Sequence, residues 1–358
     1  MGNHKSPPGS DLWGGTGLIR WPLMRKQVIG CLGVAALAVL VLSLMGNVLL
    51  SGMLFGKRAD FVQQPDRFQQ VLVQPAAGDA DRGPRIAQID LTGIISSDED
   101  KSGSSLVTEM KQALDQALHD SRVKAIVLRI DSPGGEVTAS DTIFHSVKQA
   151  NERKPIVVYM DSMAASGGYY VACGAKKVVA NVNTWTGSIG VIIQSFGYGN
   201  AMDKIGLTKR VFRSGAFKDT LSGHRELTPE ETEYMQKMVM QTYERFVGIV
   251  STARGIPVDT LKNGIADGRI ISGADAVDLK LVDRTGYLED AWQEARDLAG
   301  VKDASVVKYT RPAPLISLPS FLSKASGETQ RLEIDIADRL LPRLHPGRCY
   351  LLPESLVP

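Results

Sequence analysis

Three short segments of this sequence carry groups that suit acyl transfer. Ser166 lies in a run of small residues (163–168) that follows an apolar, β-rich stretch. Lys218 lies downstream of it, and Gly134 and Gly135 lie upstream, after another apolar stretch. A serine nucleophile, an amine base and backbone N–H donors for an oxyanion are the parts that such a reaction needs. Their combination and order predict an acyl-transfer enzyme.

The residues around Ser166 predict a turn from a strand into a helix. Residues 155–160 are apolar and β-rich, and residues 169–173 are typical of a helix. A serine at such a turn is exposed to a cleft near unpaired helix N–H groups. The alternative is that Ser166 only caps the helix. Gly167 and Gly168 disfavour that alternative, because a capped helix rarely begins with two glycines.

Gly134 and Gly135 follow a predicted buried strand (124–130) and precede a predicted helix (138–150). Glycines at the carboxyl end of a strand can direct N–H groups into a cleft, where they stabilise an oxyanion. The alternative is a tight turn that binds nothing. A phosphate-binding loop does not fit, because no Gly-Lys-Ser/Thr sequence follows.

Lys218 is the candidate base, although an isolated lysine is most often a solvated surface residue. A lysine that acts as a base at pH 7 needs its pKa lowered by about 3 units from roughly 10.4, which burial can achieve. Ser188 could orient the amine, or it could be a turn serine before a predicted strand (191–195). His224 is an alternative base, with Asp131 or Asp219 to orient it, and we rank it below Lys218.

Several ordered segments of the chain resemble the signal peptide peptidase A family, the membrane-bound serine peptidases of family S49. The resemblance covers about residues 85–299, and its segments are 131–135, 162–170, 186–191, 214–219 and 266–269. It implies that Ser166 is the nucleophile, Lys218 the general base and Ser188 the residue that supports the lysine. It also implies that Gly134 and Gly135 form the oxyanion hole, within the short, single-domain form of the family.

Predicted strands and helices alternate along residues 85–195, which indicates an α/β domain, and residues 28–50 predict an N-terminal transmembrane helix. For the α/β domain, the resemblance implies a ClpP/crotonase-like fold. It implies peptide substrates, namely remnant signal peptides and other unfolded apolar segments. It further implies a homo-oligomer in which each active site combines residues from adjacent subunits. Two other functions stay open on the residues alone, an acyl-CoA enzyme of the crotonase type and a catalytically inactive membrane scaffold.

Composition supports a large globular domain without a cofactor. The chain has 358 residues, a net charge of +2 and 43% hydrophobic residues, which is enough for a sizeable core. The balanced charge disfavours a nucleic-acid partner. No group of residues has the spacing of a metal site, and the three cysteines (Cys31, Cys173 and Cys349) form no disulfide or metal pattern.

Residues 28–50 are apolar and contain no charge, which meets the length of about 20 residues that a membrane-spanning helix needs. Arg20, Arg25 and Lys26 precede this segment and favour a cytoplasmic N-terminus. We expect a single-pass protein of the cell inner membrane whose catalytic domain is extracytoplasmic. The alternative is a cleavable signal peptide.

The remaining sequence predicts the order of the domains. Thr228, Pro229 and Glu231 are typical of a helix start with a capping box, and the apolar residues that follow suit packing on the core or on a neighbouring subunit. The C-terminal tail could occupy a cleft or a neighbour's surface, and we favour disorder or loose packing. The expected segments are a cytoplasmic segment (1–27), the anchor (28–50), a stalk (51–84), the peptidase domain (85–309) and a Pro-rich tail (310–358).

Overall fold

The computed structural model describes residues 37–47, 68–78, 83–99, 103–311 and 350–351. Two compact units divide the chain, one up to Gln64 and one from Pro65 onward. In the first unit, residues 37–47 are helical, and the rest of the predicted anchor (28–50) lies outside the described residues. Among the helices that the structure describes, none has both the length and the apolarity needed to cross a membrane.

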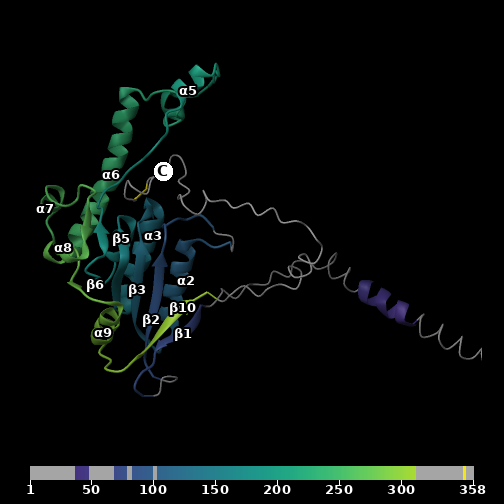
Figure 1. Ribbon diagram of the computed structural model, residues 1–358, viewed down its shortest axis with the longest axis vertical. Coiled ribbons are helices and arrows are strands. Elements are labelled where there is room, and N and C mark those ends of the chain that lie inside the picture. Colours follow the sequence, from purple (N-terminus) through teal and green to yellow (C-terminus); the bar gives the residue numbers. More distant parts are fainter. Residues whose placement is uncertain (1–36, 48–67, 79–82, 100–102, 312–349, 352–358) are drawn as a thin grey trace, which may run out of the picture. The chain divides into compact units, whose positions relative to one another are not determined.

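The second unit holds the sheet and the helices that cover it (Figure 1). Its strands are β1 (Gln69–Gln74), β2 (Arg85–Thr92), β3 (Val123–Ser132), β4 (Gly135–Glu136), β5 (Ile156–Ala165), β6 (Lys177–Ala180), β7 (Trp185–Gly187), β8 (Ile270–Ser272), β9 (Arg284–Thr285), β10 (Ser305–Thr310) and β11 (Tyr350–Leu351). Its helices are α2 (Leu106–His119), α3 (Val137–Arg153), α4 (Gly167–Ala172), α5 (Gly199–Lys204), the 3₁₀ turn η1 (Ala216–Asp219), α6 (Pro229–Arg254), α7 (Val258–Lys262), α8 (Gly273–Asp278) and α9 (Leu288–Ala299).

The main sheet has the order β1-β10-β2-β3-β5-β6-β9, and β7 pairs with both β5 and β8. Its centre is parallel, because β2, β3, β5 and β6 all run in one direction. These strands are rich in Val and Ile and are buried on both faces, which is typical of parallel sheets. The carboxyl ends of β3, β5 and β7 therefore meet at one edge.

Helices cover both faces of this sheet. On one face, α2, α3 and α4 pack their apolar residues against the strands, including Met110 and Ile143. Helix α6 packs outside them, with the Phe246 ring 5.0 Å from the ring of Tyr170 on α4. On the other face, α9 packs Trp292 and Ala295 against Val127 and its neighbours. The predicted α/β architecture is confirmed, and so are the strands near 85–91, 124–130 and 155–160 and the helices near 106–119 and 138–150.

Helix α6 begins as predicted. The Glu231 N–H donates to Thr228 Oγ1 at 3.2 Å, and the Thr228 N–H donates to Glu231 Oε2 at 2.9 Å, which completes the capping box. Apart from Glu231 in the first turn, the buried residues of the helix lie in its second half, at Phe246, Val247 and Val250. The first half projects away from the sheet together with the segment that carries α5 (Figure 1).

Two expectations need correction. Residues 191–195 do not form the predicted strand; the strand in this region is β7, which precedes Ser188. Residues 69–74 were expected in the stalk but form β1, an antiparallel neighbour of β10 at the edge of the sheet. Within the Pro-rich tail, Tyr350 and Leu351 form β11, which pairs antiparallel with β4.

Candidate active site

The turn that carries Ser166 joins β5 to α4 and is strained at the serine itself. Ser166 has φ 52° and ψ −112°, a conformation that L residues rarely adopt. Its N–H donates to the Gly187 carbonyl oxygen at 2.9 Å. Its Oγ is buried, makes no cap bond to α4 and has no hydrogen-bond partner among the described residues. The hydroxyl is thus positioned by the backbone and is not used to cap the helix.

Ser188 lies directly beside this turn. Strands β5 and β7 are parallel neighbours, and their last residues, Ala165 and Gly187, are paired. Ser166 directly follows β5 and Ser188 directly follows β7, so the two serines leave the sheet side by side. Ser188 also has a positive φ, 49°, and is 4% exposed. Its N–H donates to the Arg269 carbonyl oxygen at 2.8 Å. The structure therefore brings together the predicted nucleophile and the serine predicted to support the base.

The Gly134–Gly135 turn packs against the start of α4. Gly134 has φ 104°, its N–H donates to Ser132 Oγ at 3.1 Å, and its carbonyl oxygen accepts from the Ile95 N–H at 2.8 Å. A Cβ at position 167 would lie 3.1 Å from Gly134 Cα and 3.1 Å from Gly135 N. Glycine at position 167 therefore allows the turn and the helix to touch, which explains the small residues after Ser166.

This close packing defines a candidate oxyanion hole. The Gly134 N–H already donates a hydrogen bond to Ser132 Oγ. Gly135 is the first residue of β4, the short strand that pairs with β11. The Gly167 N–H, at the start of α4, has no acceptor among the described residues, as expected for the first turn of a helix. Gly167 was not among the predicted oxyanion donors, although the N–H after a nucleophilic serine is a recurring donor of this kind.

Lys218 lies apart from these groups in its own chain. It is an exposed residue of η1, in the segment between Ser195 and Leu227 that we call the arm. Among the described residues, no hydrogen bond joins it to Ser166 or Ser188. The arm also exposes large apolar side chains, namely Phe196, Ile205, Leu207, Phe212 and Phe217. A single chain therefore carries the predicted nucleophile and the predicted base on separate elements.

His224 also lies in the arm. Its Nδ1 is 2.7 Å from Ser222 Oγ, and its Nε2 is 3.8 Å from Asp219 Oδ2. Asp131, the other carboxylate considered for a triad, accepts a hydrogen bond from the Met163 N–H at 3.2 Å. Neither residue is joined to Ser166 by a hydrogen bond in the described part of the chain, so no Ser–His–Asp arrangement is present there.

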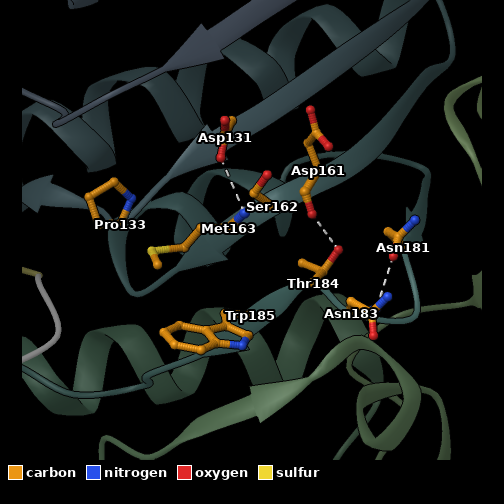
Figure 2. Close-up of a pocket in the computed structure, with 9 residues that line it drawn as sticks. All are labelled: Asp131, Pro133, Asp161, Ser162, Met163, Asn181, Asn183, Thr184 and Trp185. Carbon is orange, nitrogen blue, oxygen red and sulfur yellow. Dashed lines mark hydrogen bonds between the residues drawn. The ribbon is translucent and has the colours of Figure 1, made fainter.

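A cavity of about 670 Å³ opens beside β5, the strand that leads to Ser166 (Figure 2). Asp131, Asp161, Met163, Thr184 and Trp185 contribute to its wall. Met163 on β5 is paired with Trp185 on β7, two residues before the ends of these strands. The cavity is therefore next to the Ser166 turn, but neither Ser166 nor Ser188 lines it. We therefore place the chemistry at the turn and not in this cavity.

The described residues hold no group of His, Cys, Asp or Glu side chains that could bind a metal ion. Cys173 is free and buried, and burial raises the pKa of its thiol to about 12. Cys31 and Cys349 lie outside the described residues. Cys173 is thus a packed apolar residue and not a candidate nucleophile.

Comparisons with known proteins cover the part of the chain that contains these residues. The sequence model of peptidase family S49 matches residues 148–302, which include Ser166, Ser188 and Lys218, and that of Clp protease matches residues 93–186. A protein of Synechocystis that is classed as a protease is 39% identical over 234 residues, covering 65% of this chain and 81% of its own. A protein of Enterococcus faecium that is classed as a signal peptide peptidase SppA is 33% identical over 266 residues, covering 72% of this chain and 76% of its own.

A plant protein and a solved structure extend the comparison. The chloroplastic serine protease SPPA of Arabidopsis thaliana is 36% identical over 226 residues, covering 62% of this chain and 33% of its own. A point mutant of ClpP1 from Listeria monocytogenes covers 57% of this chain and 93% of its own, with 18% identity and a TM-score of 0.39. The Clp protease match over residues 93–186 agrees with the expected ClpP-like α/β fold in that part of the chain.

Proposed function

Because the chain belongs to peptidase family S49 and is a serine peptidase, we propose that Ser166 is its nucleophile and Lys218 its general base. The observation that carries this proposal is the Ser166 hydroxyl, which is buried and without a partner among the described residues, on a strained turn. Strain of this kind, which costs on the order of 1–3 kcal/mol, persists where the surrounding structure enforces it and is common at catalytic residues.

The reaction follows from these groups. Ser166 Oγ attacks the scissile carbonyl carbon while the neutral Lys218 amine takes the hydroxyl proton. The N–H groups of Gly135 and Gly167 stabilise the oxyanion of the tetrahedral intermediate. Gly134, whose N–H donates to Ser132 Oγ at 3.1 Å, shapes the turn that presents the Gly135 N–H. The protonated lysine then gives its proton to the leaving amine, and water hydrolyses the acyl-enzyme with the same amine as base. Ser188 holds the lysine in place.

We place Lys218 of one copy at Ser166 of an adjacent copy. The exposed position of Lys218 in the arm, and the apolar side chains around it, support a homo-oligomer in which the arm is covered by a neighbour. Mixing Ser166→Ala and Lys218→Ala chains then rebuilds complete sites from one intact serine and one intact lysine. In an equal mixture, about half of the chains carry Ser166 and about half carry Lys218. If chains assemble at random, about one quarter of the sites would therefore combine an intact serine with an intact lysine.

Peptide substrates would bind as an added strand at β4. The antiparallel pairing of β11 with β4 supports this mode of binding, because it places an extended segment next to Gly135. We propose remnant signal peptides and other unfolded apolar segments as substrates, held near the membrane by an anchor at 28–50. A chain ending at Cys349 lacks β11 and is expected to have a lower KM for peptides, because substrate no longer competes with the chain's own strand.

The test uses the full chain in detergent and a fluorogenic apolar peptide. Ser166→Ala and Lys218→Ala are each expected to lower kcat at least about 1,000-fold, whereas His224→Ala keeps activity. Loss at His224 with activity retained at Lys218 would replace the proposed base. The anchor is tested separately: full chains that leave the membrane in alkaline carbonate would contradict it.

A further inference from the structure

Arg225 forms the centre of an ion-pair cluster at the base of the arm. Its Nη2 donates to Asp219 Oδ1 at 2.8 Å and to Glu231 Oε1 at 2.6 Å, and its Nη1 donates to Glu231 Oε2 at 2.8 Å. Its Nε also donates to Asp219 Oδ2 at 3.3 Å. One guanidinium therefore bridges two carboxylates with paired hydrogen bonds, the geometry in which arginine binds most specifically.

The cluster is shielded from solvent and fully bonded. The side chains of Arg225, Asp219 and Glu231 are 27%, 10% and 3% exposed. Glu231 also accepts hydrogen bonds from Thr220 Oγ1 at 2.8 Å and from the Thr228 N–H at 2.9 Å. The hydrogen bonds from Arg225 hold the pKa of both carboxyls well below the usual range. Both carboxylates are thus ionised at neutral pH, and removing the arginine leaves two negative charges close together.

The residues on both sides of Lys218 are held in place, one by this cluster and the other by an aromatic contact. Asp219 directly follows the lysine within the single turn of η1, which is too short to be stable alone. Phe217 directly precedes it, and its ring lies 5.3 Å from the ring of Tyr234 on α6. Lys218 is therefore held between an ion pair and an aromatic contact, both of which attach η1 to the first half of α6.

We propose that Arg225 is a positioning residue that holds Lys218 where the serine of an adjacent copy can reach it. The inference rests on the proposed function, because it assigns Arg225 to the lysine half of a shared site. Asp219 is occupied by two guanidinium groups, of Arg225 and Arg213, so it does not capture the neighbouring lysine amine. Arg225 touches no substrate in this arrangement and acts only through the geometry of η1.

The kinetic test compares Arg225→Met with the full wild-type chain. We expect kcat to fall about 10- to 100-fold, the cost of a misplaced catalytic group, with KM nearly unchanged. Lys262→Met is the matched control, because Lys262 also pairs with a carboxylate of α6, Glu244, at 2.6 Å but lies outside the arm. The control should keep its kcat, and an equal loss in both variants would overturn the proposal.

Subunit mixing then locates the defect. Arg225→Met mixed with Ser166→Ala should recover about a quarter of wild-type activity. Arg225→Met mixed with Lys218→Ala should stay at or below the residual activity of Arg225→Met alone, because every lysine in that mixture is misplaced or missing. Asp219→Asn, a milder change, should show the same pattern even if Arg225→Met folds poorly. Recovery with Lys218→Ala chains, or no recovery with Ser166→Ala chains, would overturn the role of Arg225. Failure of the Ser166→Ala and Lys218→Ala mixture alone would instead refute the shared site.

Discussion

Replacing Gly135 by alanine tests the oxyanion hole most directly. A Cβ at position 135 would lie 1.9 Å from the Ile95 carbonyl oxygen and 2.7 Å from the Ile95 carbonyl carbon and nitrogen. All three are backbone atoms, so no side-chain rotation can relieve the overlap. Gly135→Ala must therefore move the whole turn away from Ile95.

The size of the effect follows from the bonds that the turn makes. The Ile95 N–H donates to the Gly134 carbonyl oxygen at 2.8 Å, and the Glu136 N–H donates to the Ile95 carbonyl oxygen at 2.8 Å. Losing both bonds should lower the free energy of unfolding by about 2 kcal/mol, at roughly 1 kcal/mol for each. Losing one oxyanion donor should lower kcat about 100- to 1,000-fold.

The assay measures kcat and KM with the fluorogenic peptide and the free energy of unfolding in urea. Gly248→Ala is the control, because a Cβ there meets no atom within 4 Å and alanine in helix α6 should stabilise the chain by up to about 1 kcal/mol. If Gly135→Ala kept kcat within about threefold of wild type while Gly248→Ala behaved as expected, the turn would not form the oxyanion hole.

Three further predictions concern single side chains. Ser140→Ala removes a buried hydroxyl that has no partner among the described residues, so urea unfolding should show equal stability or a gain of up to about 1 kcal/mol. The Cys173 thiol, with a pKa raised to about 12 by burial, should resist iodoacetamide in the folded chain at pH 8 and react in urea, as peptide mass mapping would show; rapid labelling without urea would contradict its burial. Burial alone would raise the pKa of Asp283, but the Val178 N–H and Arg254 outweigh it and lower that pKa. The stability that ionised Asp283 contributes is therefore present above its unfolded pKa of about 3.9 and is lost as pH falls through the lower, folded pKa. Asp283→Asn should lower the free energy of unfolding at pH 7 but not near pH 2. An equal loss of stability at both pH values would contradict this.

Much of the site could be predicted because it depends on local sequence. The apolar runs before Ser166 and Gly134 predict strands, and the small residues after them predict turns that allow close packing. The order of these elements then brings Ser166, Ser188 and the glycine turn to one edge of a parallel sheet. The positive φ of Ser166 needed the structure, because it depends on how α4 packs against the 132–135 turn. The Gly167 N–H, by contrast, could have been proposed as a donor from its place directly after the candidate nucleophile.

Other features depend on contacts that no local pattern specifies. Residues 191–195 contain β-branched residues, but they leave the sheet at the start of the arm and form no strand there. Strand β1 forms in a polar segment because β10 offers an open edge. The position of Lys218 relative to the serines depends on the arm, whose course is set by the Arg225 cluster and α6 rather than by propensity.

Because the backbone of Ser166 is strained, folding stability and catalytic activity favour different residues at this position. With φ 52° and ψ −112°, this position suits glycine better than any residue with a Cβ, so the substitution that relieves the strain also removes the proposed nucleophile. A population of variants selected only for yield would drift toward glycine at position 166. The variants that express best would then be well-folded chains without peptidase activity. Expression level alone is therefore a misleading measure when this protein is engineered.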